Sequence, residues 1–292
     1  MTSLWLSIIF FSISALLTKA SKIPNNFTNF CGSKPSASLL EYAAEFATLD
    51  VPEAEIFGRT SGTNHRKPQV IDTYFHVLAA NKTLEGGWVP KYLLKDQLAV
   101  IQDNYEPANF AFDLKGTTYT LYSNWTSTGP DLATRKKLRK GNRRTLNVYI
   151  VLKFDNEYLL GICQFPDQLT QSPDGIFNDG CSIVSSVLPG QDLTGYNNEG
   201  KVLTHEIGHW LGLFHTFEGW NCTGTGDFVD DTPVEAFPAG TCTLPFVWDS
   251  CPDQPGIDPI HNHMDYTEDF CRTEFTKGQI RRMWGMWKRY RA

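Results

Sequence analysis

An eleven-residue segment, HEIGHWLGLFH, constrains the chain more than any other feature. Residues from 201 onward continue a helical pattern into it, so His205 and His209 lie one turn apart on one helix face and can present two imidazoles to one ion. Gly212 lets the chain leave the helix with a positive φ, after which His215 can turn back to complete a set of three ligands. The segment therefore predicts a helix that ends near a glycine and a metal site that suits tetrahedral Zn²⁺.

The same segment supplies a carboxylate beside the metal. Glu206 lies about 100° around the helix from His205, too far for a comfortable third ligand but well placed to hold and deprotonate a zinc-bound water. Three protein ligands leave the fourth position of the ion open, which is typical of catalytic rather than structural zinc. We therefore expect one catalytic Zn²⁺ with Glu206 as general base. A chance match to this pattern in a chain of this composition has a probability on the order of 10⁻⁵.

The start of the chain predicts export. Residues 4–17 are almost continuously apolar and are followed by Thr18, Lys19 and Ala20, a pattern typical of a secretory signal peptide over residues 1–20. The alternative, a membrane anchor, needs about 20 apolar residues, and no later stretch is long enough either. We expect a secreted, extracellular product without membrane association. Export agrees with four N-glycosylation sequons, at Asn26, Asn81, Asn124 and Asn221.

Alternating helix and strand patterns predict an α/β fold in the middle of the chain. Residues 21–65 contain a short helical stretch near 39–48 but otherwise favour a leader with a poor core. After Phe214 the regular pattern gives way to Gly, Pro, Asp and Cys until a last helix. The expected strands are 69–80, 110–122, 146–154, 159–166 and 181–188, and the expected helices are 92–104, 132–140 and 276–290.

Composition narrows the functional class. With 41% hydrophobic and 20% charged residues, the chain is typical of a globular protein, and its net charge of −6 disfavours a general nucleic-acid binder. The run 135–144 holds seven basic residues in ten. It fits the exposed face and the end of a helix, but it also supports an alternative, a secreted polyanion-binding protein with a structural zinc site. An intact Glu206 and the missing fourth ligand argue against that alternative. A zinc hydrolase for small non-peptide substrates is the second alternative.

Seven cysteines in an exported chain predict disulfides and one remaining thiol. Four of them, in the region without regular pattern, are spaced 20, 9 and 20 residues apart and allow three pairings. Cys163 and Cys181 lie on the two short strands and are expected to join them. Cys31 is left without a partner. The four spaced cysteines are Cys222, Cys242, Cys251 and Cys271.

Two histidine-rich segments together resemble the metzincin metallopeptidases. The pattern at 205–215 matches their zinc-binding motif, and the segment HNHMDY resembles their methionine-containing turn beneath the zinc. Thr216 after the third histidine points away from the adamalysin-like and astacin-like branches. The blocks GDFVDDTP, DSCP, DPIHNHMDY and EFTKGQIRRM resemble the pappalysin-like branch, in particular its secreted fungal members. The resemblance runs over about residues 70–291 and departs from the usual pattern at His263 and at 220–221.

The resemblance implies roles for further residues. Met264 would form the apolar floor under the metal, although a lone methionine is otherwise most often core filler. Tyr266 would turn its phenol toward the zinc and steady the oxyanion. His261 and His263 also have the spacing of a second metal pair, but the methionine turn already explains this segment. The implied disulfides interlace as Cys222–Cys251 and Cys242–Cys271.

An acidic loop and the lone thiol remain to be assigned. The resemblance favours Ca²⁺ in the loop, and a solvated acidic loop is the alternative. Cys31 is followed by Gly32, like the Cys-Gly motif in pappalysin-like leaders, so it is a candidate zinc ligand that blocks the fourth site until the leader is cut near residues 59–66. A free or intermolecularly paired cysteine is the alternative. The candidate calcium ligands are Asp227, Asp230, Asp231, Thr232 and Glu235.

We therefore expect a zinc-dependent endopeptidase, made as a zymogen, that hydrolyses peptide bonds of proteins with a zinc-bound water activated by Glu206. It would act as a monomer on protein and peptide substrates, with no nucleic-acid or membrane partner. An upper subdomain would hold a twisted mixed sheet backed by helices and an active-site helix, and a lower one would be irregular, disulfide-linked and closed by the C-terminal helix. The expected divisions are a signal peptide 1–20, a leader 21–65 and an α+β metzincin domain 66–292, divided into 66–215 and 216–292.

Two expectations concern substrate binding. Residues 181–188 would form the edge strand at the cleft, to which a peptide adds as a further strand. The pocket for the residue after the cut would be walled by 266–270, where Phe270 offers an apolar surface and Asp269 a carboxylate. The preference at that position is therefore apolar or basic, and we favour an apolar or mixed preference.

Overall fold

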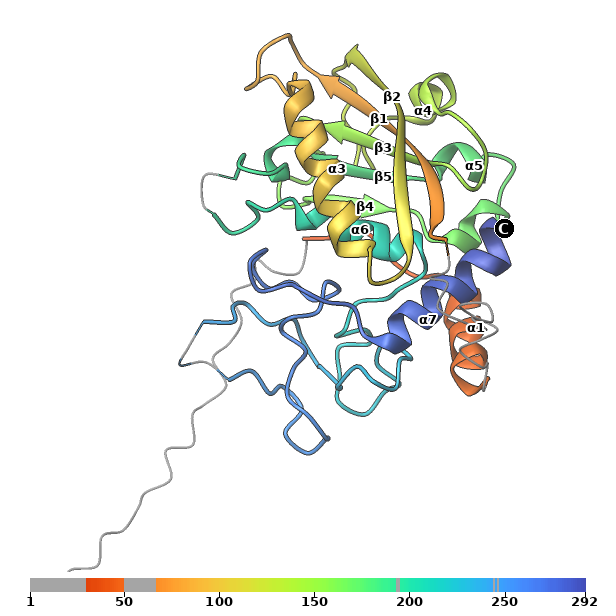
Figure 1. Ribbon diagram of the computed structural model, residues 1–292, viewed down its shortest axis with the longest axis vertical. Coiled ribbons are helices and arrows are strands. Elements are labelled where there is room, and N and C mark those ends of the chain that lie inside the picture. Colours follow the sequence, from red (N-terminus) through yellow and green to blue (C-terminus); the bar gives the residue numbers. More distant parts are fainter. Residues whose placement is uncertain (1–29, 50–66, 193–194, 244, 246) are drawn as a thin grey trace, which may run out of the picture.

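Five strands form one mixed sheet in the order β2-β1-β3-β5-β4 (Figure 1). The computed structural model describes residues 30–49, 67–192, 195–243, 245 and 247–292. β1, β2, β3 and β5 run parallel, and β4 pairs antiparallel with β5. The predicted α/β fold with a mixed sheet is confirmed. The strands are β1 (Gln69–Ala79), β2 (Phe110–Leu121), β3 (Leu146–Val151), β4 (Gly161–Cys163) and β5 (Cys181–Val184).

The centre of the sheet is continuously buried and mostly apolar, with His76 and Asn147 hydrogen-bonded to each other within it. All six residues of β3 (LNVYIV) are buried, as are the last five of β1. Such unbroken runs are typical of parallel strands covered on both faces. Helix α3 (Lys91–Tyr105) packs on β2, and α6 (Lys201–Trp210) packs on β4, β5 and α3. The sheet therefore supports α6, the helix that carries the histidine motif.

Two short helices and the C-terminal helix complete the fold. α4 (Leu132–Leu138) and α5 (Gly175–Asn178) contact each other, and α7 (Lys277–Met286) continues into a π-helix, Trp287–Arg291. α7 begins with a capping box between Thr276 and Gln279. The Trp284 ring in α7 stacks on Phe110 at 4.6 Å between centroids, which ties the C-terminal helix to the start of β2. Single-turn 3₁₀ segments occur at Pro166–Leu169 and Ser185–Val187.

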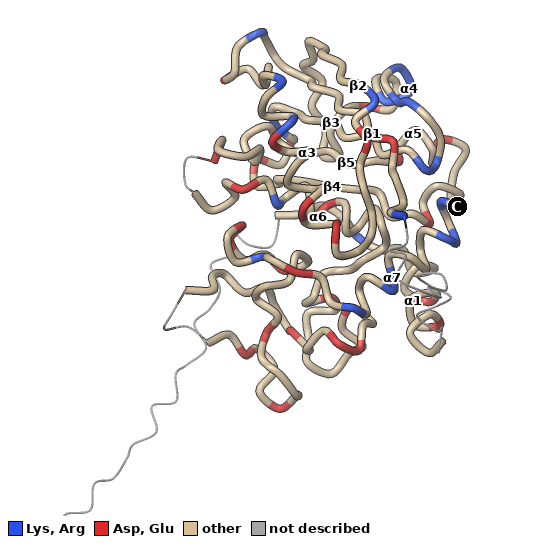
Figure 2. Tube along the Cα trace, viewed as in Figure 1, with Lys and Arg blue, Asp and Glu red and all other residues tan. Residues whose placement is uncertain are grey.

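The lower half of the molecule is irregular, as expected. Between α6 and α7 the described residues form neither helix nor strand, and Cys222–Cys251 and Cys242–Cys271 cross-link this region. Figure 2 shows acidic residues spread through it, whereas Lys and Arg gather around α4 and the C-terminus. These disulfides stabilise a region that lacks regular secondary structure, because they reduce the conformational freedom of the unfolded chain.

The leader has more core than the sequence indicated. α1 (Ala37–Thr48) starts at Ser36, whose side chain accepts a hydrogen bond from the Leu39 amide. Leu39, Ala43 and Phe46 form a helical apolar stripe and are buried, and α1 lies beside α7 in Figure 1. A side chain at Gly285 in α7 would overlap the Phe46 ring, so the glycine makes room for it. The expectation of a poor core is therefore wrong for residues 30–49.

The expected edge strand is also wrong. β5 ends at Val184 and lies between β3 and β4, so β4 is the edge strand. β5 pairs in parallel with β3 on one side and antiparallel with β4 on the other, where Cys163 and Cys181 lie opposite each other and are joined by a disulfide. This places β5 inside the sheet, where its four residues are all buried.

Some predicted features lie outside the described residues. These include the signal peptide, the sequon at Asn26 and the processing segment 59–66. Within the described part of the chain, no helix has both the length and the apolar character needed to cross a membrane.

Candidate active site

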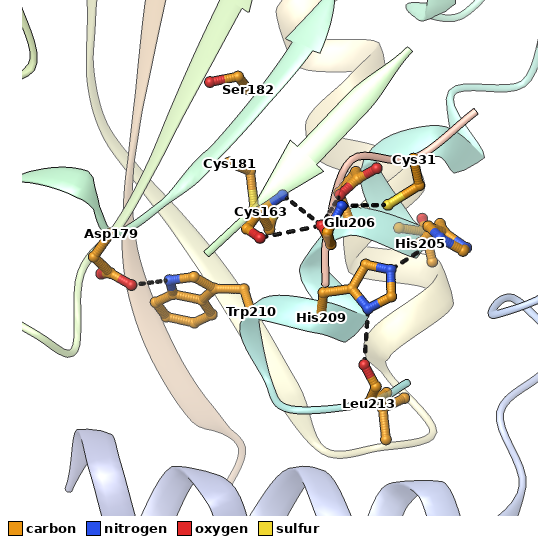
Figure 3. Close-up of a disulfide and its surroundings, with 12 residues drawn as sticks. Cys31, Cys163, Asp179, Cys181, Ser182, His205, Glu206, His209, Trp210 and Leu213 are labelled. Atoms are coloured by element: carbon orange, nitrogen blue, oxygen red, sulfur yellow. Dashed lines mark hydrogen bonds between the residues drawn. A yellow bond between two sulfur atoms is a disulfide. The ribbon is translucent and has the colours of Figure 1, made fainter. Parts of the chain in front are cut away.

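Helix α6 is held at both ends by side chains from elsewhere in the chain. At its start, Asp269 Oδ2 accepts hydrogen bonds from the amides of Glu199 (2.8 Å) and Lys201 (3.2 Å). At its end, the Trp210 indole donates to Asp179 Oδ1 at 2.9 Å (Figure 3). Three residues beyond its last histidine the chain turns at Gly212, which has the expected positive φ of 91°. These contacts fix the direction in which the helix presents its histidines.

The three predicted histidines converge. Nε2 of His209 lies 3.1 Å from Nε2 of His205 and 3.2 Å from Nε2 of His215. Ligands at 2.0–2.1 Å from a tetrahedral zinc ion are about 3.3 Å apart, so the three nitrogens fit such an ion. Burial lowers the pKa of His205 and His209 well below the ordinary value. Both rings are therefore neutral, which is the form that binds a metal.

Backbone carbonyls orient two of these rings. Nδ1 of His205 lies 2.8 Å from the His263 carbonyl, and Nδ1 of His209 lies 2.8 Å from the Leu213 carbonyl (Figure 3). A carbonyl only accepts, so each Nδ1 carries the hydrogen and each Nε2 keeps a lone pair for the metal. Two of the three predicted ligands thus have the tautomer that metal binding needs.

The methionine turn lies directly beneath the helix. Met264 is fully buried, and a side chain at Gly208 would overlap its sulfur atom. Tyr266 is buried as well, with its hydroxyl 3.0 Å from Nε2 of His215. Met264 therefore packs against the helix between His205 and His209, and Tyr266 lies beside the third histidine.

The leader passes over this group of histidines. The sulfur of Cys31 and the ligand atoms of the three histidines all lie within 4.8 Å of one another. The backbone of Cys31 bridges Gly161 of β4 in parallel orientation, with hydrogen bonds from Gly32 N to Gly161 O and from Leu160 N to Phe30 O, both 3.0 Å. Cys31 is thus beside the site and not in a detached segment.

Glu206 is held by a leader residue that the sequence did not single out. Ser33 Oγ accepts a hydrogen bond from the Cys163 amide (2.9 Å) and donates one to Glu206 Oε2 (3.1 Å). Burial is the main reason that the pKa of the Glu206 carboxyl rises to about 8. No sequence signal marks a serine two residues after a cysteine, since its role depends on how the leader lies on β4.

The remaining predicted features are distributed over the surface and the lower half. All three expected disulfide pairs are present, and Cys31 is the one free cysteine among the seven, all of which are described. His263 is buried with its ring tilted against that of Phe275, whereas His261 is exposed, so the two side chains do not converge as a metal pair. The exposed sequon residues are Asn81, Asn124 and Asn221.

The acidic loop is not gathered at one point. Asp227, Thr232 and Glu235 are buried, but Asp230 and Asp231 are exposed, and in the part of the chain that the structure describes only the histidine and Cys31 group converges as a metal-binding cluster. The sequence did not single out Asp265, which accepts from the Ala239 amide together with Glu235, each at 3.2 Å. Burial raises the pKa of Asp265 to about 8 and raises that of Glu235 well above its usual range.

The basic run is partly internal. Arg135 is buried, with hydrogen bonds to the Pro130 carbonyl and to Ser182 Oγ, and Arg139 is paired with Asp179 at 3.2 Å. These arginines hold α4 against the sheet. Two of the seven basic residues on which the polyanion-binding alternative depends are therefore already engaged inside the protein.

Comparisons with known proteins agree with this geometry. Residues 136–288 match the Peptidase M43 family, described as pregnancy-associated plasma protein-A. An extracellular metalloprotease of Neurospora crassa is 48% identical over 222 residues, which are 76% of this chain and 76% of that protein. Extracellular metalloprotease 1 of Coccidioides posadasii is 40% identical over 273 residues, 94% of each chain.

Solved structures show the same fold. Mature mirolysin of Tannerella forsythia, in complex with a cleaved peptide, superposes with a TM-score of 0.61 at 25% identity, covering 74% of this chain and 90% of that one. A mutant of promirolysin from the same organism gives a TM-score of 0.65 at 24% identity, covering 89% and 94%.

Proposed function

The chain belongs to the Peptidase M43 family of pappalysin-like metzincins, and from this premise we propose that it is a secreted zinc endopeptidase in which Glu206 activates the attacking water. The observation that carries the proposal is the convergence of three imidazole Nε2 atoms, 3.1 and 3.2 Å apart, beside a carboxylate on the same helix. Two of the donors, His205 and His209, are neutral imidazoles whose tautomers are fixed by backbone carbonyls, which is the chemistry that zinc prefers.

The residues divide the reaction among them. His205, His209 and His215 would hold a zinc ion, which when bound polarises the scissile carbonyl and makes a water more acidic. Glu206 takes the proton from the attacking water and later passes it to the leaving amine. The Tyr266 hydroxyl, beside His215, donates a hydrogen bond to the oxygen that becomes negatively charged.

Glu206→Ala tests this mechanism. The variant removes the base but no ligand, so it should keep its zinc and lose peptidase activity by about 10²–10⁴-fold or more. Glu106→Ala, at an exposed position after α3, is the matched control and should keep full activity. Casein digestion with and without a chelator, together with elemental analysis, measures both properties. A Glu206→Ala protein that holds zinc and digests casein at the wild-type rate would disprove the assignment.

The casein assay also separates the alternatives. A zinc hydrolase for small non-peptide substrates and a polyanion-binding protein would both leave casein intact, with or without the chelator.

The leader is proposed to keep the enzyme latent. Residues 1–20 would be a signal peptide, 21–65 a leader and 66–292 the catalytic domain, with Cys31 as a fourth zinc ligand in the precursor. The sulfur of Cys31 is close enough to the histidines for this, and a thiolate is a stronger zinc ligand than water. Ser33 supports the same proposal because its hydroxyl holds the carboxylate that must accept the proton. Cleavage near residues 59–66 would allow the leader to depart.

We propose a calcium site in the lower half with fewer ligands than the acidic loop that the sequence suggested. Glu235 and Asp265 are two buried carboxylates that share one amide donor, and each has an oxygen without a hydrogen-bond partner among the described residues. Two such carboxylates repel each other unless a cation or a proton lies between them. We expect added Ca²⁺ to raise the thermal midpoint of the zinc-loaded protein, and an unchanged midpoint would exclude the site.

A further inference from the structure

Phe30 of the leader fills a pocket beside the histidines. Its side chain is only 7% exposed, and its ring centroid lies 4.8 Å from that of Tyr266 and 6.3 Å, edge-on, from that of His205. The guanidinium carbon of Arg272 lies 5.6 Å from the centre of the Phe30 ring, within the range of a cation–π contact. An aromatic side chain therefore already occupies this pocket in the precursor.

The position of Phe30 corresponds to the residue after the cut. The leader runs parallel to β4: Cys31 bridges Gly161, Leu160 N donates to Phe30 O, and Gly32 N donates to Gly161 O. A substrate strand that pairs antiparallel with this edge, the slightly more stable arrangement, runs the opposite way. Its scissile carbonyl lies at the histidines, so the residue that reaches the Phe30 pocket follows the scissile bond.

The charged residues at the base of this pocket disfavour a basic side chain in the substrate. Asp269 lies in the expected wall, but its carboxylate is fully engaged: Oδ1 binds Nη2 of Arg272, and Oδ2 caps α6 at Glu199 and Lys201. Arg272 is completely buried, and its Nε and Nη1 have no partner in the part of the chain that the structure describes. Phe270, which the sequence favoured as the apolar wall, is instead 48% exposed. The charge offered to a bound side chain is therefore the cation and not the carboxylate.

We propose that Arg272 determines the specificity of this pocket: it accepts a large aromatic residue after the cut, whose ring lies against the guanidinium, and rejects Lys and Arg. The inference rests on the proposed peptidase function and deepens it by naming the substrate class. Like charges brought together in a dry pocket are strongly unfavourable, whereas a ring placed over a buried guanidinium is attracted to it. Arg272 thus supplies the selection, and Asp269 holds Arg272 in place.

The first experiment compares activated enzymes on quenched peptides that differ only in the residue after the cut. We expect the wild type to cleave before Phe at least about tenfold faster, as kcat/KM, than before Arg. Arg272→Gln should release the carboxylate of Asp269 and raise cleavage before Arg by at least about tenfold. The double variant Asp269→Asn with Arg272→Gln removes both charges and should not gain this activity. A wild-type preference for Lys or Arg, or an Arg272→Gln enzyme that folds with an unchanged Phe-to-Arg ratio, would overturn the proposal.

A second measurement leaves the enzyme unaltered and so does not depend on the folding of a variant. Synthetic leader peptides of residues 27–36 are added to the activated wild-type enzyme as inhibitors. The Phe30→Tyr peptide should inhibit as well as the natural sequence, and the Phe30→Lys peptide at least about tenfold more weakly. Equal inhibition by the Lys peptide would overturn the proposal. An activated preparation that cleaves no peptide or protein would refute the proposed function itself, which is a separate outcome.

Discussion

Asp179→Asn should unfold the protein more readily than its small chemical change suggests. Asp179 is buried and serves three partners at the end of the active-site helix. Its Oδ1 accepts from the Trp210 indole and from Arg291 Nη2, both at 2.9 Å, and its Oδ2 accepts from Arg139 and from Arg291 Nη1, both at 3.2 Å. The Arg291 guanidinium also lies 3.5 Å from the centre of the Trp210 ring and donates to the Trp210 carbonyl.

The expected loss follows from leaving two buried cations without a counter-charge. The side chains of Arg291 and Arg139 are 0% and 3% exposed, so water cannot replace the carboxylate. Removing one partner of a buried ion pair costs about 3–5 kcal/mol. In a domain of this size each kcal/mol shifts the thermal midpoint by about 2–4 °C, so the midpoint should fall by about 6–20 °C.

The measurement is a denaturant and thermal unfolding series on a Glu206→Ala background, which prevents self-digestion. Asp174→Asn is the matched control, because Asp174 pairs with Lys136 at 2.7 Å but both side chains are more than a third exposed. That pair should contribute about 0.5 kcal/mol or less. An Asp179→Asn protein within 1 kcal/mol of its parent, by the same assay in which a loss of about 3–5 kcal/mol is expected, would refute the reasoning.

Two further predictions concern latency and pH. Cys31→Ser should give a precursor that is prematurely active or self-degrading, and a Cys31→Ser precursor as latent as the wild type in a peptide-cleavage assay would exclude the thiol switch. Ser33→Ala should give a precursor whose basal activity rises by up to about tenfold, because the leader loses a buried hydrogen bond to the Glu206 carboxyl. Burial lowers the pKa of His76 from 6.5 to about 4, so between these two pH values the unfolded chain binds a proton at His76 more readily than the folded protein does. The free energy of unfolding should therefore fall by up to about 3 kcal/mol as the pH falls from about 6.5 to about 4. His76→Gln should flatten this part of the stability profile, and identical profiles would contradict the assignment.

The fold was predictable where the pattern was long and locally determined. The apolar run of β1, the helix at α3 and the C-terminal helix were all placed within a few residues, because each has a periodic pattern and clear ends. The order of short strands was not predictable, since three-residue β4 and four-residue β5 carry too little pattern to show which lies at the edge. The parallel pairing of β5 with β3, which leaves β4 at the edge, decides it.

The site divides in the same way. The three histidines and Glu206 lie within eleven residues on one helix and its following turn, so their spacing alone indicated that they converge. Asp269 and Arg272 could not be assigned from sequence, because a carboxylate in a pocket wall predicts basic specificity until its own partner is known. The partner of Asp269 is Arg272, only three residues away, but the tertiary structure buries both side chains and so keeps the carboxylate paired with Arg272.

Residues 30–33 contact several parts of the candidate site at once. On an extended strand, side chains two residues apart lie on the same face, so Cys31 and Ser33 both turn toward α6, one to the histidines and the other to Glu206. Phe30 lies with its ring 4.8 Å, centroid to centroid, from that of Tyr266. Four consecutive residues therefore lie against the histidines, Glu206 and Tyr266 at once. Because these contacts share a single backbone, weakening any one of them loosens the others, and in the proposed latent precursor their contributions would be coupled and not additive.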